Sequence, residues 1–256
     1  PDGTAVGAQF SNAGANTVHA ISGLAGGGFV VSGIGFFSIR DEDGTLVTSG
    51  NISGPSFSFS PLATVLGTSD GGFVVADIIP NLSVNYSPVS FQRFDAGGNP
   101  TTSRLTVSAD PSGFATRTSI IELSTGKFVV SYYNADSPQG TRAIILEADG
   151  SEAVSEFLVS SVINAELIAL DDGNFMSING TTGGVKIYTE LGTEVSSSSI
   201  PMAGTGSIAT ARLTNGNIVL ITVEISDDDV DHYATIIDST GSVVKEKFRV
   251  NSTPSK

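Results

Sequence analysis

The stretch Asp70-Gly71-Gly72-Phe73-Val74-Val75 places a tight glycine turn directly before a run of apolar residues. The same pattern occurs five times along the chain, each time with Phe or Ile after the turn. The aligned residues are Phe29, Phe73, Phe128, Phe175 and Ile218. Successive steps between them are about 44, 55, 47 and 43 residues, which is the period range of propellers and solenoids. The sequence therefore predicts a protein built from five repeats.

A second glycine turn recurs later in every repeat, at Gly44, Gly98, Gly150, Gly192 and Gly241. The residue three positions before this glycine is acidic in four repeats and is Thr189 in the fourth repeat. The acidic residues are Asp41, Asp95, Glu147 and Asp238. Aspartate at a turn accepts hydrogen bonds from nearby backbone N–H groups. We interpret these acids as turn caps rather than as calcium ligands.

Alternating apolar residues that approach and leave each glycine turn are typical of β-hairpins. Each repeat contains four such segments, so the fold class is predicted to be all-β, with five four-stranded antiparallel blades in a β-propeller. The predicted blades cover residues 13–54, 55–108, 109–160, 161–203 and 204–251. Residues 4–12 are predicted to add a closing strand, because Gln9-Phe10-Ser11-Asn12 resembles the end of a repeat.

Three alternatives to this architecture stay open. A β-solenoid has a similar repeat signal, and a further segment could complete a partial propeller. The segment Glu152–Leu170 lacks Gly and Pro and shows some helical spacing, so a helix competes with strands there.

Composition narrows the classes of function. The 256 residues carry a net charge of −14 with only 12 Lys and Arg, which argues against nucleic acid as a partner. No apolar run approaches the length of a membrane span, so membrane insertion is not expected. Cysteine is absent, which removes disulfides and thiol catalysis. A start at Pro1-Asp2 is what we expect of a processed or excised chain.

Three segments resemble a repeat found in large secreted bacterial proteins. They are the Gly-Gly-Phe-Val-Val unit, the segment Phe91-Gln92-Arg93-Phe94-Asp95-Ala96-Gly97-Gly98-Asn99, and Phe248-Arg249-Val250-Asn251. The similar proteins are surface or RTX-type, calcium-associated adhesins and exoproteins. Repeats four and five depart from the pattern at Met176, Thr189 and Ile218, and the nonapeptide calcium repeats of RTX proteins are absent. The resemblance implies an extracellular propeller used as a binding or spacer module.

The densest group of charges is Asp227-Asp228-Asp229-Val230-Asp231. Ca²⁺ prefers several oxygen ligands from a flexible loop, so these four carboxylates are the candidate metal site, with Ca²⁺ as the one cofactor considered. The spacing is not that of an EF-hand, and a solvated loop is the competing interpretation. Among the aromatic residues, Tyr86, Tyr132 and Tyr133 lie near expected strand ends and are candidates for contact with a glycan or a protein.

No catalytic motif is recognisable, and only His19 and His232 could serve as histidine acid–base groups. The sequence therefore favours a non-catalytic module for adhesion, display or assembly that is extracellular, on the cell surface or on a virion. Its expected partner is a protein or a glycan on a surface. The expected contact loops are Ile79–Pro88, Ala135–Thr141 and Ser226–Asp231, clustered on one rim.

Two other functions stay open. One is a lectin or carbohydrate-active enzyme that uses the propeller channel, with carboxylates and aromatic side chains converging at one mouth. The other is a fibre or particle subunit that assembles by exchange of its terminal strands.

Overall fold

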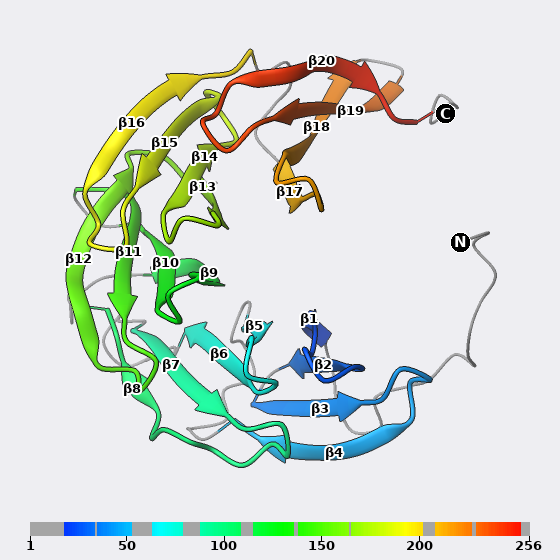
Figure 1. Ribbon diagram of the computed structural model, residues 1–256, viewed down its shortest axis with the longest axis vertical. Helices are drawn as coiled ribbons and strands as arrows, with labels where there is room; N and C mark the ends of the chain where they lie inside the picture. Colours follow the sequence, from blue (N-terminus) through cyan, green and yellow to red (C-terminus); the bar gives the residue numbers. More distant parts are fainter. Residues whose placement is uncertain are drawn as a thin grey trace.

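A computed structural model describes residues 18–33, 35–52, 63–78, 88–108, 115–135, 138–163, 165–201, 208–226 and 229–251. These residues form twenty β-strands in five separate four-stranded sheets. Every sheet is an antiparallel meander of four consecutive strands, and we call each sheet a blade. Figure 1 shows the blades side by side along an arc, with the first strand of each blade on the inside and the fourth on the outside. The prediction of an all-β fold with five four-stranded antiparallel sheets is confirmed.

The strands have the following bounds. Blade 1 contains β1 (Val18–Gly23), β2 (Phe29–Gly33), β3 (Phe36–Arg40) and β4 (Leu46–Asn51). Blade 2 contains β5 (Thr64–Gly67), β6 (Phe73–Ile78), β7 (Val89–Phe94) and β8 (Leu105–Thr106). Blade 3 contains β9 (Ala115–Glu122), β10 (Phe128–Asn134), β11 (Gly140–Leu146) and β12 (Glu152–Ser160). Blade 4 contains β13 (Ala165–Ala169), β14 (Phe175–Asn179), β15 (Gly184–Tyr188) and β16 (Glu194–Ser199). Blade 5 contains β17 (Ile208–Arg212), β18 (Ile218–Ser226), β19 (Asp229–Ile237) and β20 (Val243–Arg249).

Several alternatives from the sequence are thereby decided. The stretch that competed as a helix is extended, because β12 and β13 occupy it. Separate antiparallel sheets also exclude a solenoid. The closing strand predicted at residues 4–12 lies outside the described residues and stays a prediction. No helix in the described part of the chain is long and apolar enough to span a membrane.

Both recurring glycines have a conformational cause. The glycine of the first turn has φ between 72° and 94° in every repeat, as at Gly71 (93°) and Gly126 (82°). The glycine of the second turn does the same, as at Gly98 (81°) and Gly150 (84°). A side chain in this left-handed region costs about 1–2 kcal/mol, which glycine avoids. The two turn positions can therefore recur as glycine for backbone reasons alone.

The three aspartates before the second turn cap it, as expected, whereas the prediction is wrong for Glu147. Asp41, Asp95 and Asp238 each accept two backbone N–H groups, two and four residues ahead, at 2.7–3.1 Å. Thr189 takes the same role in blade 4 through its hydroxyl. In blade 3 the Ser151 N–H is accepted by Asp149 instead of Glu147. Hydrogen bonds from Asn99 lower the pKa of Asp95, which fits an ionised cap.

The core lies between the blades. One face of each blade packs on the preceding blade, and we call it the leading face; the opposite, trailing face packs on the following blade. The aligned aromatic residues Phe73, Phe128 and Phe175 lie on leading faces and are 0% exposed. The residues after them, such as Val74 and Val129, lie on trailing faces and are also 0% exposed. Each hydrophobic cluster therefore joins two neighbouring blades.

The second-turn glycines also belong to these contacts. A Cβ atom on Gly150 would lie 2.6 Å from Leu105 Cδ1 and 3.3 Å from the Phe91 ring, both in the preceding blade. The equivalent contact of Gly98 is with the Phe37 ring at 2.8 Å. By contrast, a Cβ atom on Gly126, in the first turn of blade 3, would meet nothing within 4 Å. The second turn therefore tolerates no side chain because the neighbouring blade is too close.

These two glycines give a matched test of the blade contact. Gly126→Ala should cost about 1 kcal/mol of unfolding free energy, from its positive φ alone. Gly150→Ala should cost that amount and a further ~1–3 kcal/mol, because the methyl group overpacks the contact with blade 2. Urea unfolding of both variants measures the difference. Equal losses would contradict a contact between the turn of blade 3 and blade 2.

Candidate functional site

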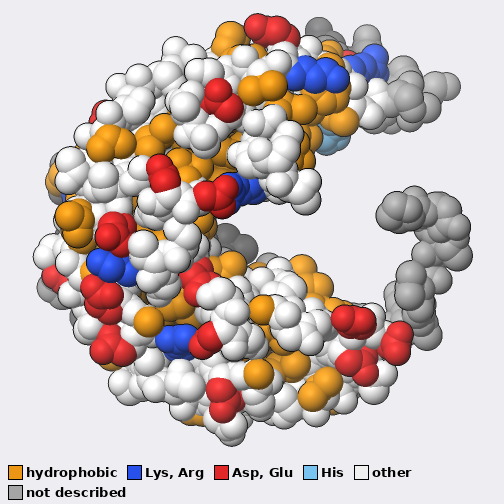
Figure 2. Space-filling view, viewed as in Figure 1, with side chains coloured by type: hydrophobic (Ala, Val, Ile, Leu, Met, Phe, Trp, Pro, Cys, Tyr) orange, Lys and Arg blue, Asp and Glu red, His pale blue; other side chains and the backbone are white. Residues whose placement is uncertain are grey.

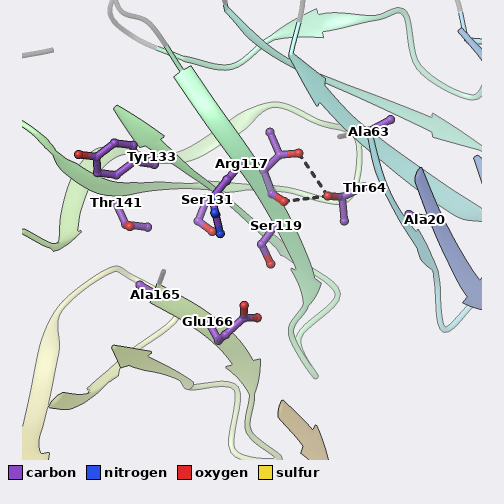
Figure 3. Close-up of a pocket in the computed structure, with 11 residues that line it drawn as sticks. Ala20, Ala63, Thr64, Arg117, Ser119, Ser131, Tyr133, Thr141, Ala165 and Glu166 are labelled. Atoms are coloured by element: carbon purple, nitrogen blue, oxygen red, sulfur yellow. Dashed lines mark hydrogen bonds between the residues drawn. The ribbon is translucent and has the colours of Figure 1, made fainter. Parts of the chain in front are cut away.

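A pocket lies on the inner side of the arc, where the first strands of four blades begin (Figure 3). Its volume is about 240 Å³. Blades 1, 2, 3 and 4 all contribute to it, and hydroxyl groups line much of its wall. The lining residues are Ala20, Ala63, Thr64, Arg117, Thr118, Ser119, Ser131, Tyr133, Thr141, Ala165 and Glu166.

Arg117 reaches this pocket from a β-bulge. On β10, Tyr132 pairs with Thr118 and the next residue, Tyr133, pairs with Thr116, so Arg117 is the extra residue of β9. Its φ of 54° is the one positive value at a non-glycine residue in the described part of the chain. A side chain in this conformation stores strain of about 1–3 kcal/mol, and such strain is found most often at functional sites. The bulge therefore aims a strained, exposed cation at the pocket.

Glu166 faces Arg117 across the pocket. It lies near the start of β13 and points toward β9 in Figure 3. Burial raises the pKa of Glu166, while the positive charge of Arg117 acts in the opposite direction. Glu166 is the single carboxylate among the lining residues that the structure describes.

The hydroxyl groups divide into two sets. Thr64 Oγ1 donates to the Thr118 carbonyl oxygen at 2.8 Å, and this bond joins blades 2 and 3. Thr141 Oγ1 donates to the Val162 carbonyl oxygen at 2.8 Å. The hydroxyls of Ser119 and Ser131 make no hydrogen bond within the described part of the chain, although Ser131 is only 2% exposed. A hydroxyl group that lacks a protein partner can bond a ligand or water, so the Ser131 hydroxyl and the half-buried Ser119 hydroxyl are available to either.

The tyrosines that the sequence suggested as contact residues lie in different places. Tyr133 lines the pocket. Tyr132 points to the other side of β10, is 2% exposed and belongs to the core between blades 2 and 3. Tyr86 lies outside the described residues.

The acidic candidates for a metal site do not converge on this pocket. Asp227 and Asp228 lie outside the described residues, and Asp229 begins β19 opposite Ser226. Asp231 lies 2.5 Å from Arg249 Nη2 and accepts a hydrogen bond from Asn251. No group of three or more metal-ligating side chains occurs among the residues that the structure describes. The calcium site stays a prediction.

The predicted contact loops leave from the same rim as the pocket. Antiparallel pairing places the end of β10 beside the start of β9, so the connection from β10 to β11 begins next to Arg117. Two of the predicted loops are shorter than expected, because Gly140 and Thr141 belong to β11, Ser226 to β18 and Asp229–Asp231 to β19. Residues 79–88, 135–139 and 227–228 connect the second and third strands of their blades. Most of these residues lie outside the described part, and their role in contacts stays a prediction.

Sequence reasoning did not find Arg117, Glu166, Ser119 or Ser131. Arg117, Ser119 and Glu166 do not recur at the equivalent positions of the other repeats, and Ser131 recurs only as Ser32 in the first repeat. They lie on three strands, β9, β10 and β13. A weak signal existed at Arg117, the only charged residue in the polar run Thr116–Ser119 that begins a strand otherwise expected to be apolar.

Comparisons with known proteins agree on the fold. A crystal structure of a protein of unknown function from Bacteroides caccae aligns with a TM-score of 0.59 at 15% identity, over 91% of this chain and 81% of that one. The WD40 domain of Neurospora crassa Pan2 aligns with a TM-score of 0.55 at 14% identity, over 89% and 64%. The chain has a β-propeller fold. An α-L-arabinofuranosidase from Fusarium graminearum gives a TM-score of 0.55 at 9% identity, over 82% and 71%. No family model and no curated protein sequence matches the chain.

The strain at Arg117 predicts an unusual order of stability for two truncations. Arg117→Gly and Arg117→Ala both remove the guanidinium group, but only glycine accepts a φ of 54° without strain. We expect the glycine variant to be more stable than the alanine variant by about 1 kcal/mol in urea unfolding. If alanine is as stable as glycine, the bulge is not strained.

Glu166 predicts a pH dependence of stability. Because its pKa is raised in the folded state, folding favours the protonated form. The contribution of protonated Glu166 to folding stability is fully present below the ordinary pKa of a glutamate, and it is lost as pH rises through the pKa of Glu166 in the folded state. Removing the charge in Glu166→Gln should therefore raise Tm relative to wild type more at pH 7 than at pH 4. Glu246→Gln, an exposed position on β20, is the control. A shift that does not depend on pH would contradict the burial of a charge at Glu166.

Proposed function

We propose that this chain is a non-catalytic binding module of a secreted or surface-associated protein, and that the pocket on the inner side of the arc holds one sugar unit of a glycan. The observation that carries the proposal is the lining of the pocket, where Arg117 on its bulge is surrounded by hydroxyl groups and one carboxylate. Sugars are recognised by several convergent hydrogen bonds, and such a site discriminates strongly against ligands that lack the matching hydroxyl.

The size of the pocket and its hydrogen-bonding groups support a small, hydrophilic ligand. Its volume of about 240 Å³ is below the usual ~300–1,000 Å³ of sites for drug-sized molecules. Ser119 and Ser131 offer hydroxyls that can donate and accept, Arg117 offers donors, and Glu166 offers an acceptor. Tyr133 adds an aromatic ring at the edge, where the apolar face of a sugar can pack.

The carboxylate count favours binding over cleavage. Glycosidases place two carboxylates on either side of the bond that they break. Among the described lining residues Glu166 alone carries a carboxylate, and its neighbour across the pocket is a cation. Binding of a glycan on a cell or particle surface agrees with the adhesive role that the sequence favours. The resemblance to repeats of secreted bacterial proteins supports an extracellular setting.

Glycan binding can be tested on a glycan array, followed by saturation-transfer NMR and calorimetry with the best ligand. Arg117→Ala should weaken binding at least ~10-fold, since one charge-assisted hydrogen bond contributes about 1.5–3 kcal/mol. Arg212→Ala is the matched control, because Arg212 pairs with Asp171 away from the pocket. Unchanged affinity in Arg117→Ala, or no glycan bound by the wild type, would contradict the proposal. Release of reducing sugar from the bound glycan would show an enzyme instead.

A further inference from the structure

Among the residues that the structure describes, no blade covers the trailing face of blade 5. In Figures 1 and 2 the arc of described residues is open between blade 5 and blade 1. The face consists of side chains that alternate along β18, β19 and β20. Its members are Val219, Ile221, Val223, Ala234, Ile236 and Phe248.

The position of Val219 is fully buried in the other blades. The residues aligned with Val219 are Val30, Val74, Val129 and Met176, and all four are 0% exposed. Val219 itself is partly exposed, and so are Ile221, Ile236 and Phe248. The chemistry of the face is therefore that of an internal blade contact, but part of its surface remains in solvent.

The contact between blades 4 and 5 indicates what fits such a face. The trailing face of blade 4 is aliphatic, with Met176 paired with Ile187 and Ile178 paired with Val185. Blade 5 repeats this pattern, with Val219 paired with Ile236 and Ile221 paired with Ala234. The trailing face of blade 4 is covered by a leading face that is also aliphatic, made of Ile218, Leu220 and Ile237.

Blade 1 is a poor match for this face. Opposite the aligned aromatic residue, its third strand carries Arg40, where the other blades carry Phe94, Leu146, Tyr188 and Ile237. Arg40 is 7% exposed, and its Nη1 donates to the Gly44 carbonyl oxygen in the second turn of blade 1. The trailing face of blade 5 carries a cation of its own, Lys245, whose Nζ lies 4.2 Å from the centre of the Phe248 ring. Packing blade 1 on this face would bring two cationic side chains to a contact that is apolar between blades 4 and 5. Blade 1 of a second copy is unfavourable for the same reason.

We propose that the trailing face of blade 5 is a docking surface for one further four-stranded blade of this repeat type, whose leading face carries aliphatic or aromatic residues at the positions of Ile218 and Ile237. The proposal does not depend on the function of the pocket.

The direct test extends the full chain with a blade of known fit. A second copy of residues 204–251 is joined after Lys256, because its leading face already covers an aliphatic trailing face in the native protein. We expect Tm to rise by about 5 °C, a shift typical of one to two kilocalories of added stability in a chain of this size. Dye binding to apolar surface is no measure here, because the added copy exposes a trailing face of its own. A control extension carries the equivalents of Ile218→Ser and Ile237→Ser in the added copy only, and should not raise Tm.

The unextended chain supplies a second, independent measurement. Val129→Ser, in a covered trailing face, should lower Tm strongly, whereas Val219→Ser should lower it little. In the extended chain Val219→Ser should remove most of the gain. If Val219→Ser and Val129→Ser are equally damaging in the unextended chain, the face is already covered and the proposal is wrong.

Two other outcomes would also overturn it. An added copy that leaves Tm unchanged shows that a blade does not dock there. Dimers of the unextended chain in light scattering, lost in Val219→Ser, show that a second copy is the occupant.

Discussion

Packing of one blade against the next is the interaction on which the rest of this structure depends. A blade is a single sheet with apolar side chains on both faces, so it cannot bury its own core. Phe128 illustrates the consequence: it belongs to blade 3, yet its ring packs 5.6 Å from that of Phe91 in blade 2, and its exposure is zero. Burying one such side chain contributes about 1.5–3 kcal/mol. The order of the blades therefore follows from complementary faces, as in other repeat proteins where each unit contacts its neighbours.

The same packing explains why the architecture could be predicted from the sequence. A repeated contact needs repeated residues, so the aligned Phe or Ile and the two turn glycines recur at a fixed spacing. The glycines recur for two physical reasons, since their φ values are positive and, in the second turn, the preceding blade leaves no room for a Cβ atom. Thr189 shows the tolerance of the pattern, because a hydroxyl caps the turn in place of a carboxylate.

The pocket could not be predicted in this way, because its residues are exceptions to the repeat. Arg117 is placed by a change of register between β9 and β10, and a bulge of this kind leaves no clear mark in the sequence. Glu166 and Ser131 come together only because blades 3 and 4 are neighbours in the ring. The acidic cluster at 227–231 was a candidate because of its charge density, yet Asp231 forms an ion pair with Arg249. Charge density indicated an exposed loop, whereas the candidate site depends on convergence of single residues.

The two rims of the structure, formed by the two ends of the strands, consequently differ in how freely they can vary. At one rim, short glycine turns are fixed by caps and by contact with the preceding blade, which leaves little freedom for variation. At the other rim, the connections that leave from the ends of the second strands differ in length, from residues 227–228 to residues 79–88, and the pocket lies beside them. Loops on a rigid scaffold can vary without loss of the fold, which is why binding sites concentrate there.

Blades 1 to 4 supply all the described lining residues, and blade 5 supplies the open trailing face. Ligand binding in the pocket and docking at the open end therefore use different residues. Val219→Ser can weaken docking of a blade without weakening ligand binding, since Val219 lines no part of the pocket.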